Sequence, residues 1–260
     1  MSVFRLAILE TDVPFPIAQE TRGSYGDIFR DLLTTGLRNL GPKGDGVQLE
    51  VTKWDVLESQ TYPAVDAADG FLITGSRYNA YDNDPWILKL VGFIGTVLAT
   101  TEKPIVGTCF GHQIMGRVLG SKVAVNPNGW EISVQNVNFN EAGQKLFGVP
   151  SLELHQFHHD IVFEVPPGVI NLGSSSACAN QVFYRPGRIL TFQGHPEFDN
   201  LITSEILKSD LALTLFDEAA IKGALSRVGR PHGGLFLGAK MAEFLLASQL
   251  ADTKIPLARL

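Results

Sequence analysis

A single cysteine between two glycines is the feature of this sequence that most clearly suggests chemistry. Residues 104–116 read PIVGTCFGHQIMG, which contains the pattern Gly107-x-Cys109-x-Gly111 between an apolar run and a helical pattern. This pattern is typical of a nucleophile held at a sharp strand-to-helix turn, where small neighbours avoid a collision with the backbone. Free N–H groups at the start of a helix favour a thiolate, and that of Phe110 would face an oxyanion beside the sulfur. A small buried core cysteine is the alternative for this segment alone.

A thiol nucleophile needs a group that takes and returns a proton, and the chain has six histidines as candidates: His112, His155, His158, His159, His195 and His232. His195 stands at the end of a predicted strand in the sequence Gln193-Gly-His-Pro-Glu197. In an extended backbone, side chains two residues apart project to the same side, so Glu197 could orient the His195 imidazole. This is the base-and-orienter half of a catalytic triad, although an isolated His-Pro-Glu is more often a surface turn.

Taken together, the Cys109 segment and the Gln193–Glu197 segment resemble the paired signatures of class I glutamine amidotransferases. The resemblance covers roughly residues 70–198 and implies a catalytic triad of Cys109, His195 and Glu197. Two motifs in this order are far more specific than either motif alone.

The same resemblance implies roles for further residues near the proposed nucleophile. Residues 72–76 look like the family's glycine-containing loop, so a backbone N–H of Gly75 or Ser76 would complete the oxyanion hole with that of Phe110. Gln113 matches the glutamine that lines the substrate pocket. His158 matches a histidine beside the active site and receives no chemical step.

Residues 155–160, with sequence HQFHHD, combine residue types that bind zinc. In an extended strand, His155 and His159 face one way while His158 and Asp160 face the other, so a metal site is not expected. Arg77 could meet a substrate carboxylate through two parallel hydrogen bonds, although an exposed loop arginine is more often only solvated.

The remaining chemistry-bearing residues predict no further site. Cys178 has neither an elbow nor a nearby base, so we expect a structural role. The glycines of residues 41–46 lack both phosphate-loop spacings, and no cofactor is expected.

The resemblance implies a cysteine hydrolase that cleaves the γ-amide of glutamine, or of a γ-glutamyl compound, through a γ-glutamyl thioester on Cys109. Two enzymatic interpretations stay open. A separate synthetase protein could accept the ammonia, or the chain could act alone as a γ-glutamyl peptidase, whose sequences residues 70–87 resemble. A catalytically silent regulatory member also stays open, as does a different cysteine-elbow α/β hydrolase, in which the acid would precede the histidine.

The elements that must position these residues follow from the apolar periodicity. In the first half, short apolar runs alternate with helical patterns, which predicts a parallel sheet. From residue 122 to 194 the period shifts to two, which predicts a β-rich second half before three helices end the chain. The predicted strands are residues 4–9, 47–54, 70–73, 104–107, 132–139, 151–157, 181–184 and 189–192, and the predicted helices are 25–40, 85–101, 111–119, 200–215, 217–227 and 235–250.

We therefore expect one α/β domain over residues 1–260, a three-layer αβα fold of flavodoxin or Rossmann type with a mainly parallel central sheet. Residues 11–26, with their prolines and glycines, are expected to form a loop at the mouth of the pocket that selects the substrate.

Composition limits the class of partner. The chain is 45% hydrophobic and carries a net charge of −6 without a basic patch, so we expect a small-molecule substrate and no nucleic-acid partner. No apolar stretch reaches membrane-spanning length, so neither membrane insertion nor a signal peptide is expected. We expect a cytoplasmic location. The ending Ala258-Arg259-Leu260 approximates a peroxisomal address, a weaker alternative than a C-terminus without a targeting role.

Overall fold

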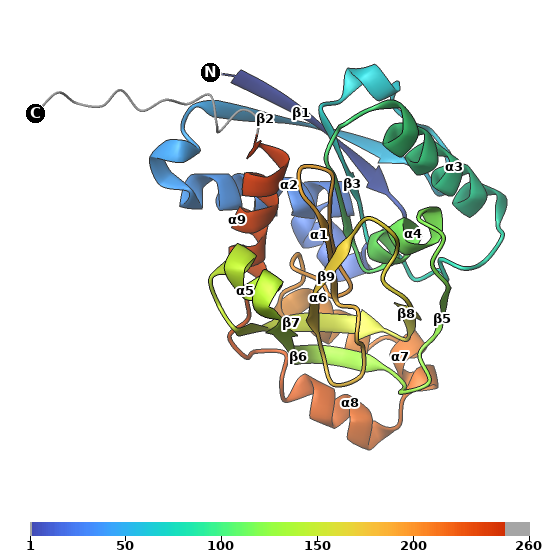
Figure 1. Cartoon of the computed structure of the whole chain (residues 1–260). Helices are drawn as coiled ribbons and strands as arrows, with labels where there is room; N and C mark the ends of the chain where they lie inside the picture. Colours follow the sequence, from blue (N-terminus) through green and yellow to red (C-terminus); the bar gives the residue numbers. More distant parts are fainter. Residues whose placement is uncertain (1, 248–260) are drawn as a thin grey trace, which may run out of the picture.

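A nine-stranded mixed sheet forms the centre of the molecule in the computed structural model, which describes residues 2–247 (Figure 1). The strands lie in the order β2-β1-β3-β4-β11-β10-β9-β6-β7. The parallel half comprises β1 (Ser2–Glu10), β2 (Val47–Asp55), β3 (Gly70–Ile73), β4 (Ile105–Thr108) and β11 (Ile189–Phe192).

The second half of the sheet is antiparallel, as the period of two predicts. It comprises β10 (Val182–Arg185), β9 (Ile170–Ser174), β6 (Glu131–Phe139) and β7 (Ser151–His158). A separate antiparallel pair joins β5 (Val123–Val125) to β8 (Asp160–Val162). One continuous sheet therefore includes strands from both halves of the chain.

Helices cover both faces of the parallel half and confirm the expected three-layer fold. On one face, α2 (Tyr25–Asn39) and α9 (Gly234–Leu245) pack against Leu6 and Ile8 of β1. On the other face, α3 (Pro85–Thr100) and α4 (Phe110–Val118) pack against Ala7 and Leu9. Alternate side chains of one strand point to opposite faces, so β1 contributes to both cores and is buried on each side.

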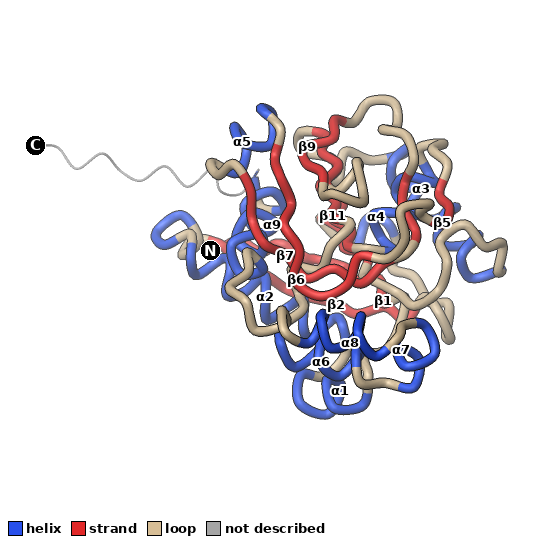
Figure 2. Tube along the Cα trace, turned by 90° about the horizontal axis from the view of Figure 1, so that it is seen from below, coloured by secondary structure: helices blue, strands red, loops and turns tan. Residues whose placement is uncertain are grey.

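The remaining helices pack around the antiparallel half, where α1 (Pro16–Arg22), α6 (Asn200–Leu207), α7 (Asp210–Leu215) and α8 (Glu218–Leu225) gather on one side (Figure 2). A further helix, α5 (Glu141–Phe147), connects β6 to β7, and short 3₁₀ turns lie at Gly41–Lys43 and Val65–Ala67. None of the helices in the described part of the chain combines the length and apolar character needed to cross a bilayer.

Residues 11–26 were expected to be a loop. Residues 11–15 form neither helix nor strand, but residues 16–22 form α1 and Tyr25 begins α2, so the prediction is wrong for this second part. Pro16 stands at the first turn of α1, where a missing N–H costs nothing. The N–H groups of Ile17 and Ala18 donate to the carboxylate of Glu205 at 2.6 and 2.8 Å. A cap supplied from a distant helix leaves no local signal in the sequence.

The predicted single helix over residues 200–215 is also wrong, because it divides into α6 and α7. Ser209 lies between the two helices, and its hydroxyl accepts a hydrogen bond from Ala212 N at 3.3 Å. Serine is favoured at such N-terminal caps, so Ser209 starts a new helix. The short elements α5, β5, β8 and β9 have too few residues for a clear periodicity and were not predicted.

The end of the predicted helix 235–250 and the tripeptide Ala258-Arg259-Leu260 lie outside the described residues. For that reason, the single-domain organisation over residues 1–260 stays a prediction.

Candidate active site

Cys109 occupies a strained turn between β4 and α4. Its φ of 47° is one of three positive values among the described residues other than glycine. The Cys109 N–H donates to Phe192 O at 2.8 Å and ties the turn to β11, while its carbonyl accepts from Gln113 N at 3.0 Å. A Cβ on Gly107 would lie 2.7 Å from the backbone of Gly111, so the turn needs glycine at this position.

His195 follows β11 and is held from three directions. Its N–H donates to His155 O at 2.8 Å, its Nδ1 lies 2.8 Å from Glu197 Oε1, and its ring stacks on Phe198 with centroids 3.9 Å apart. Burial alone would lower the pKa of His195, but the negative charges of Cys109 and Glu197 raise it to about 10. A protonated, positively charged His195 imidazole is therefore favoured at neutral pH.

Sheet topology brings these segments together. Strands β3, β4 and β11 are parallel neighbours, so the segments that follow their carboxyl ends meet at one edge of the sheet. A Cβ on Gly75, after β3, would lie 3.0 Å from His195 Cε1 and 3.6 Å from Cys109 Cβ. The Gly75 carbonyl accepts a hydrogen bond from the Thr11 hydroxyl at 2.8 Å, and Ser76 Oγ donates to Thr11 O at 2.9 Å. The Gly75 loop therefore lies next to the side chains of Cys109 and His195.

A cavity of about 330 Å³ opens above Cys109 and His195. The polar side chains on its wall include five sequence-predicted site residues or their neighbours: Ser76, Arg77, Gln113, His158 and Asp160. The Phe110 side chain points elsewhere and stacks on Trp86 in the core, with ring centroids 5.4 Å apart. As the first residue of α4, Phe110 has an N–H with no acceptor inside the helix, so only its backbone can face the cavity.

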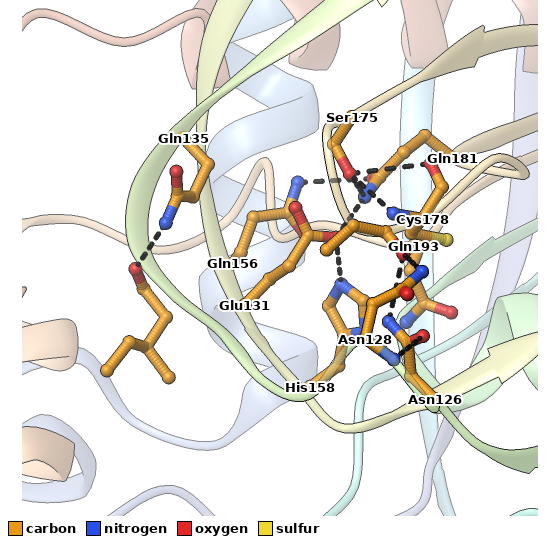
Figure 3. A network of polar contacts seen from close by, with 12 residues as sticks. Asn126, Asn128, Glu131, Gln135, Gln156, His158, Ser175, Cys178, Gln181 and Gln193 are labelled. Carbon is orange, nitrogen blue, oxygen red and sulfur yellow. Dashed lines mark hydrogen bonds and ion pairs between the residues drawn. The ribbon is translucent and has the colours of Figure 1, made fainter.

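A buried polar network supports one wall of the cavity (Figure 3). His158 Nε2 lies 3.1 Å from Glu131 Oε2, and both side chains are almost fully buried. Gln181 Nε2 donates to the same carboxylate oxygen at 2.9 Å, and Gln156 Nε2 donates to Gln181 Oε1 at 3.1 Å. His158 thus lies at the cavity as predicted, with a carboxylate partner that the sequence pattern did not indicate.

Gln113 and Asp160 lie together on this wall. Gln113 Nε2 donates to Asp160 O at 2.9 Å and to Gln193 Oε1 at 3.3 Å. The Nδ1 of His158 lies 3.1 Å from the same Asp160 carbonyl. Burial raises the pKa of the Asp160 carboxyl. The wall therefore presents a carboxyl group and an amide to any bound molecule.

Comparison with known proteins shows which protein family this chain is related to. The sequence model of the family described as glutamine amidotransferase class-I matches residues 25–211. This chain belongs to the class I glutamine amidotransferase family. It is 36% identical to a glutamine amidotransferase-like protein of Schizosaccharomyces pombe, over 94% of this chain and 99% of that protein.

Two further proteins extend this comparison. Gamma-glutamyl peptidase 3 of Arabidopsis thaliana is 30% identical over 94% of this chain and 96% of that protein. The crystal structure of a glutamine amidotransferase from Thermotoga maritima matches with a TM-score of 0.68 and 20% identity, and covers 96% of this chain and 99% of that structure. The match to the Thermotoga maritima structure shows that this chain shares the amidotransferase fold.

In this amidotransferase-family chain, Arg77 already has an anionic partner. Its Nε lies 3.0 and 2.9 Å from the two carboxylate oxygens of Asp12, and its Nη2 donates to Val13 O at 3.0 Å. Arg77 therefore lines the cavity as part of an ion pair with Asp12 and not as an uncommitted guanidinium.

The histidine-rich segment does not converge on one point. His155 Nδ1 lies 2.9 Å from the Thr203 hydroxyl, whereas the ring of His159 stacks on Trp130 with centroids 4.9 Å apart. Among residues 2–247, no group of three or more His, Cys, Asp or Glu side chains could hold a metal ion. Cys178 is buried, and burial raises the pKa of its thiol to about 12, consistent with the structural role expected of it.

Several residues at the site carried no recognised signal in the sequence. Asp12 stands two residues after the end of β1, so its place near the carboxyl end of a parallel strand was a usable clue. Tyr25 begins α2 and lines the cavity, where burial and the charges of Asp12 and Glu197 raise the pKa of its phenol. Glu131 starts a strand of the antiparallel half and comes to the site only through sheet pairing with His158.

Proposed function

We propose that this chain is a stand-alone cysteine hydrolase that cleaves the γ-amide bond of γ-glutamyl compounds through a thioester on Cys109. The observation that carries this proposal is the placement of the strained Cys109 beside the His195–Glu197 pair, at the floor of a cavity. A thiolate, an imidazolium and a buried carboxylate in this order are the parts that acyl transfer requires.

In the first half-reaction, the Cys109 thiolate attacks the γ-carbonyl carbon and forms a C–S bond. The oxyanion that develops is stabilised by the backbone N–H groups of Phe110 and of Gly75 or Ser76. The His195 imidazolium then donates its proton to the amide nitrogen, the C–N bond breaks, and the free amine leaves. Glu197 keeps the imidazole oriented and stabilises its positive charge.

In the second half-reaction, neutral His195 takes a proton from water as the oxygen attacks the thioester carbon. The C–S bond breaks, glutamate is released, and the thiolate–imidazolium pair is restored. Gln113, His158 and Asp160 lie on the wall that supports the glutamyl group, where the Asp160 carboxylate suits an ammonium group. Arg77 lines the same cavity but is held in its ion pair with Asp12, so it receives no role in these steps.

Two observations support a peptidase acting alone. Gamma-glutamyl peptidase 3 aligns with this chain over almost the full length of both proteins. The cavity of about 330 Å³ is also lined by apolar side chains, among them Phe198, Leu211 and Leu215, for which a departing ammonia has no use. The second candidate, release of ammonia to a separate synthetase, is supported by the name of the related amidotransferase-like protein of S. pombe.

Product analysis tests the proposal and separates the two candidates. Incubation with γ-glutamyl dipeptides should release glutamate and the second amino acid, and mass spectrometry should detect a transient γ-glutamyl adduct on Cys109. Ammonia release from glutamine without dipeptide cleavage would favour the second candidate.

The matched variants are Cys109→Ala and Cys178→Ala. Cys109→Ala should abolish turnover with the fold intact, whereas Cys178→Ala should keep the wild-type turnover. Full activity of Cys109→Ala would overturn the assignment of the nucleophile. Circular dichroism spectra matching the wild type would show that both variants are folded.

A further inference from the structure

The cavity has two chemically different sides, and the proposed mechanism uses only one of them. The polar side carries Gln113, His158 and Asp160. A second set of lining side chains, which we name the apolar wall, consists of Phe15, Phe157, Phe198, Ile206, Leu211 and Leu215. These six side chains have no role in positioning the triad beyond the contact of Phe198 with His195.

The apolar wall is built from segments far apart in the chain. Phe15, Phe157, Phe198 and Ile206 belong to one hydrophobic cluster that includes residues of α1, α2 and α6. The next helix, α7, adds Leu211 and Leu215, each 41% exposed. Helices α1, α6 and α7 lie on the same side of the sheet (Figure 2). Apolar surface of this extent inside a polar-rimmed cavity is typical of a subsite for an apolar group.

The position of His195 decides which part of a substrate faces this wall. The His195 ring stacks on Phe198, so the proton donor of the reaction stands at the edge of the apolar wall. The γ-amide nitrogen must approach His195 to receive its proton. A substituent on that nitrogen therefore begins close to Phe198, which belongs to the apolar wall.

We infer that the leaving amine carries a large apolar substituent, as in a γ-glutamyl dipeptide whose second residue is aromatic or branched aliphatic. This inference rests on the proposed function and specifies its substrate class. An unsubstituted amide or a glycine would leave the exposed surface of Leu211 and Leu215 in water, whereas an apolar side chain would cover it and gain binding free energy.

The test compares kcat/KM of the wild-type enzyme for γ-glutamyl-phenylalanine, γ-glutamyl-glycine and glutamine. We expect phenylalanine to be favoured over glycine by at least about 10-fold, the discrimination typical of an apolar pocket. In the double variant Leu211→Ser/Leu215→Ser, most of this preference should disappear.

A matched control lies on the same helix. Leu213 of α7 is 60% exposed and does not line the cavity, so Leu213→Ser removes similar apolar surface from the molecule without altering the wall. This variant should keep the wild-type preference. As a measurement independent of turnover, the Cys109→Ala variant should bind γ-glutamyl-phenylalanine more tightly than γ-glutamyl-glycine in calorimetry.

The outcomes separate the apolar subsite from the proposed function. Equal kcat/KM for the two dipeptides in the wild type, or a preference that survives in the double variant, overturns the apolar subsite and leaves the proposed function standing. Failure of the wild type to cleave any γ-glutamyl amide overturns both. Loss of preference in Leu213→Ser as well would assign the effect to a general disturbance of α7 and count against the subsite.

Discussion

Replacing Gly75 by alanine introduces one methyl group at the centre of the site. The new Cβ would lie 3.0 Å from His195 Cε1 and 3.5 Å from His195 Nδ1. Gly75 is not among the glycines with positive φ, so alanine can adopt its backbone conformation without strain. The substitution therefore acts on the position of the imidazole rather than on the fold.

The size of the effect follows from this contact. Carbon atoms pack best about 3.5 to 4.0 Å apart, so the ring must recede by roughly half an ångström or more. Its freedom to do so is small, because Nδ1 is held 2.8 Å from Glu197 and one face is stacked on Phe198. A misplacement of about 1 Å can cost roughly 100-fold in rate, so we expect kcat to fall about 10- to 100-fold.

The assay is steady-state hydrolysis of a γ-glutamyl dipeptide, with thermal unfolding of the same samples. Gly92→Ala is the control, because Gly92 lies on the exposed face of α3 and a Cβ there would meet nothing within 4 Å. The control should keep full activity and gain about 0.5 to 1 kcal/mol of stability. Wild-type kcat in a folded Gly75→Ala variant would refute the proposed geometry of Gly75 and His195.

Two further predictions concern the buried carboxylates. Glu197→Gln removes one of the charges that raise the pKa of His195 to about 10. The imidazolium is lost as pH rises through that pKa, so the alkaline limb of the pH profile of kcat/KM should move to lower pH in this variant. An alkaline limb at the wild-type pH would contradict this role of Glu197. Glu131→Gln leaves His158 without its anionic partner in a buried site, so the free energy of unfolding should fall by about 1 to 3 kcal/mol. Urea denaturation measures this loss, and stability equal to the wild type would show that the pair contributes nothing net.

Local sequence was sufficient where the chemistry is local. The glycines around Cys109 predict a tight strand-to-helix turn because only small residues fit it, and the structure has that turn with φ at 47°. The two-residue spacing in His195-Pro-Glu197 predicts a direct contact, and the side chains lie 2.8 Å apart. Strong helical periodicity likewise predicted α2, α3 and α4 within a few residues of their ends.

Contacts between segments that are far apart in the chain could not be predicted from the sequence pattern. Glu131 and His158 meet because β6 and β7 pair in one register, and a register shift of one residue would turn Glu131 to the other face. Arg77 is held by Asp12, and α1 is capped by Glu205, through side chains far away in the chain. The periodicity of apolar residues does not reveal such partners. Because the cap that Glu205 supplies to α1 could not be predicted, residues 11–26 were expected to be a loop.

By itself, the sequence indicated the family and the residues proposed for the reaction, because the nucleophile turn and the histidine–carboxylate pair each depend on the conformation of a few adjacent residues. Only the tertiary structure decided what surrounds that reaction. Parallel strands β3, β4 and β11 bring three separate segments to one edge, and helices α1, α6 and α7 complete the cavity above them. The shape and polarity of that cavity arise from packing between segments, and packing is a property of the folded chain as a whole.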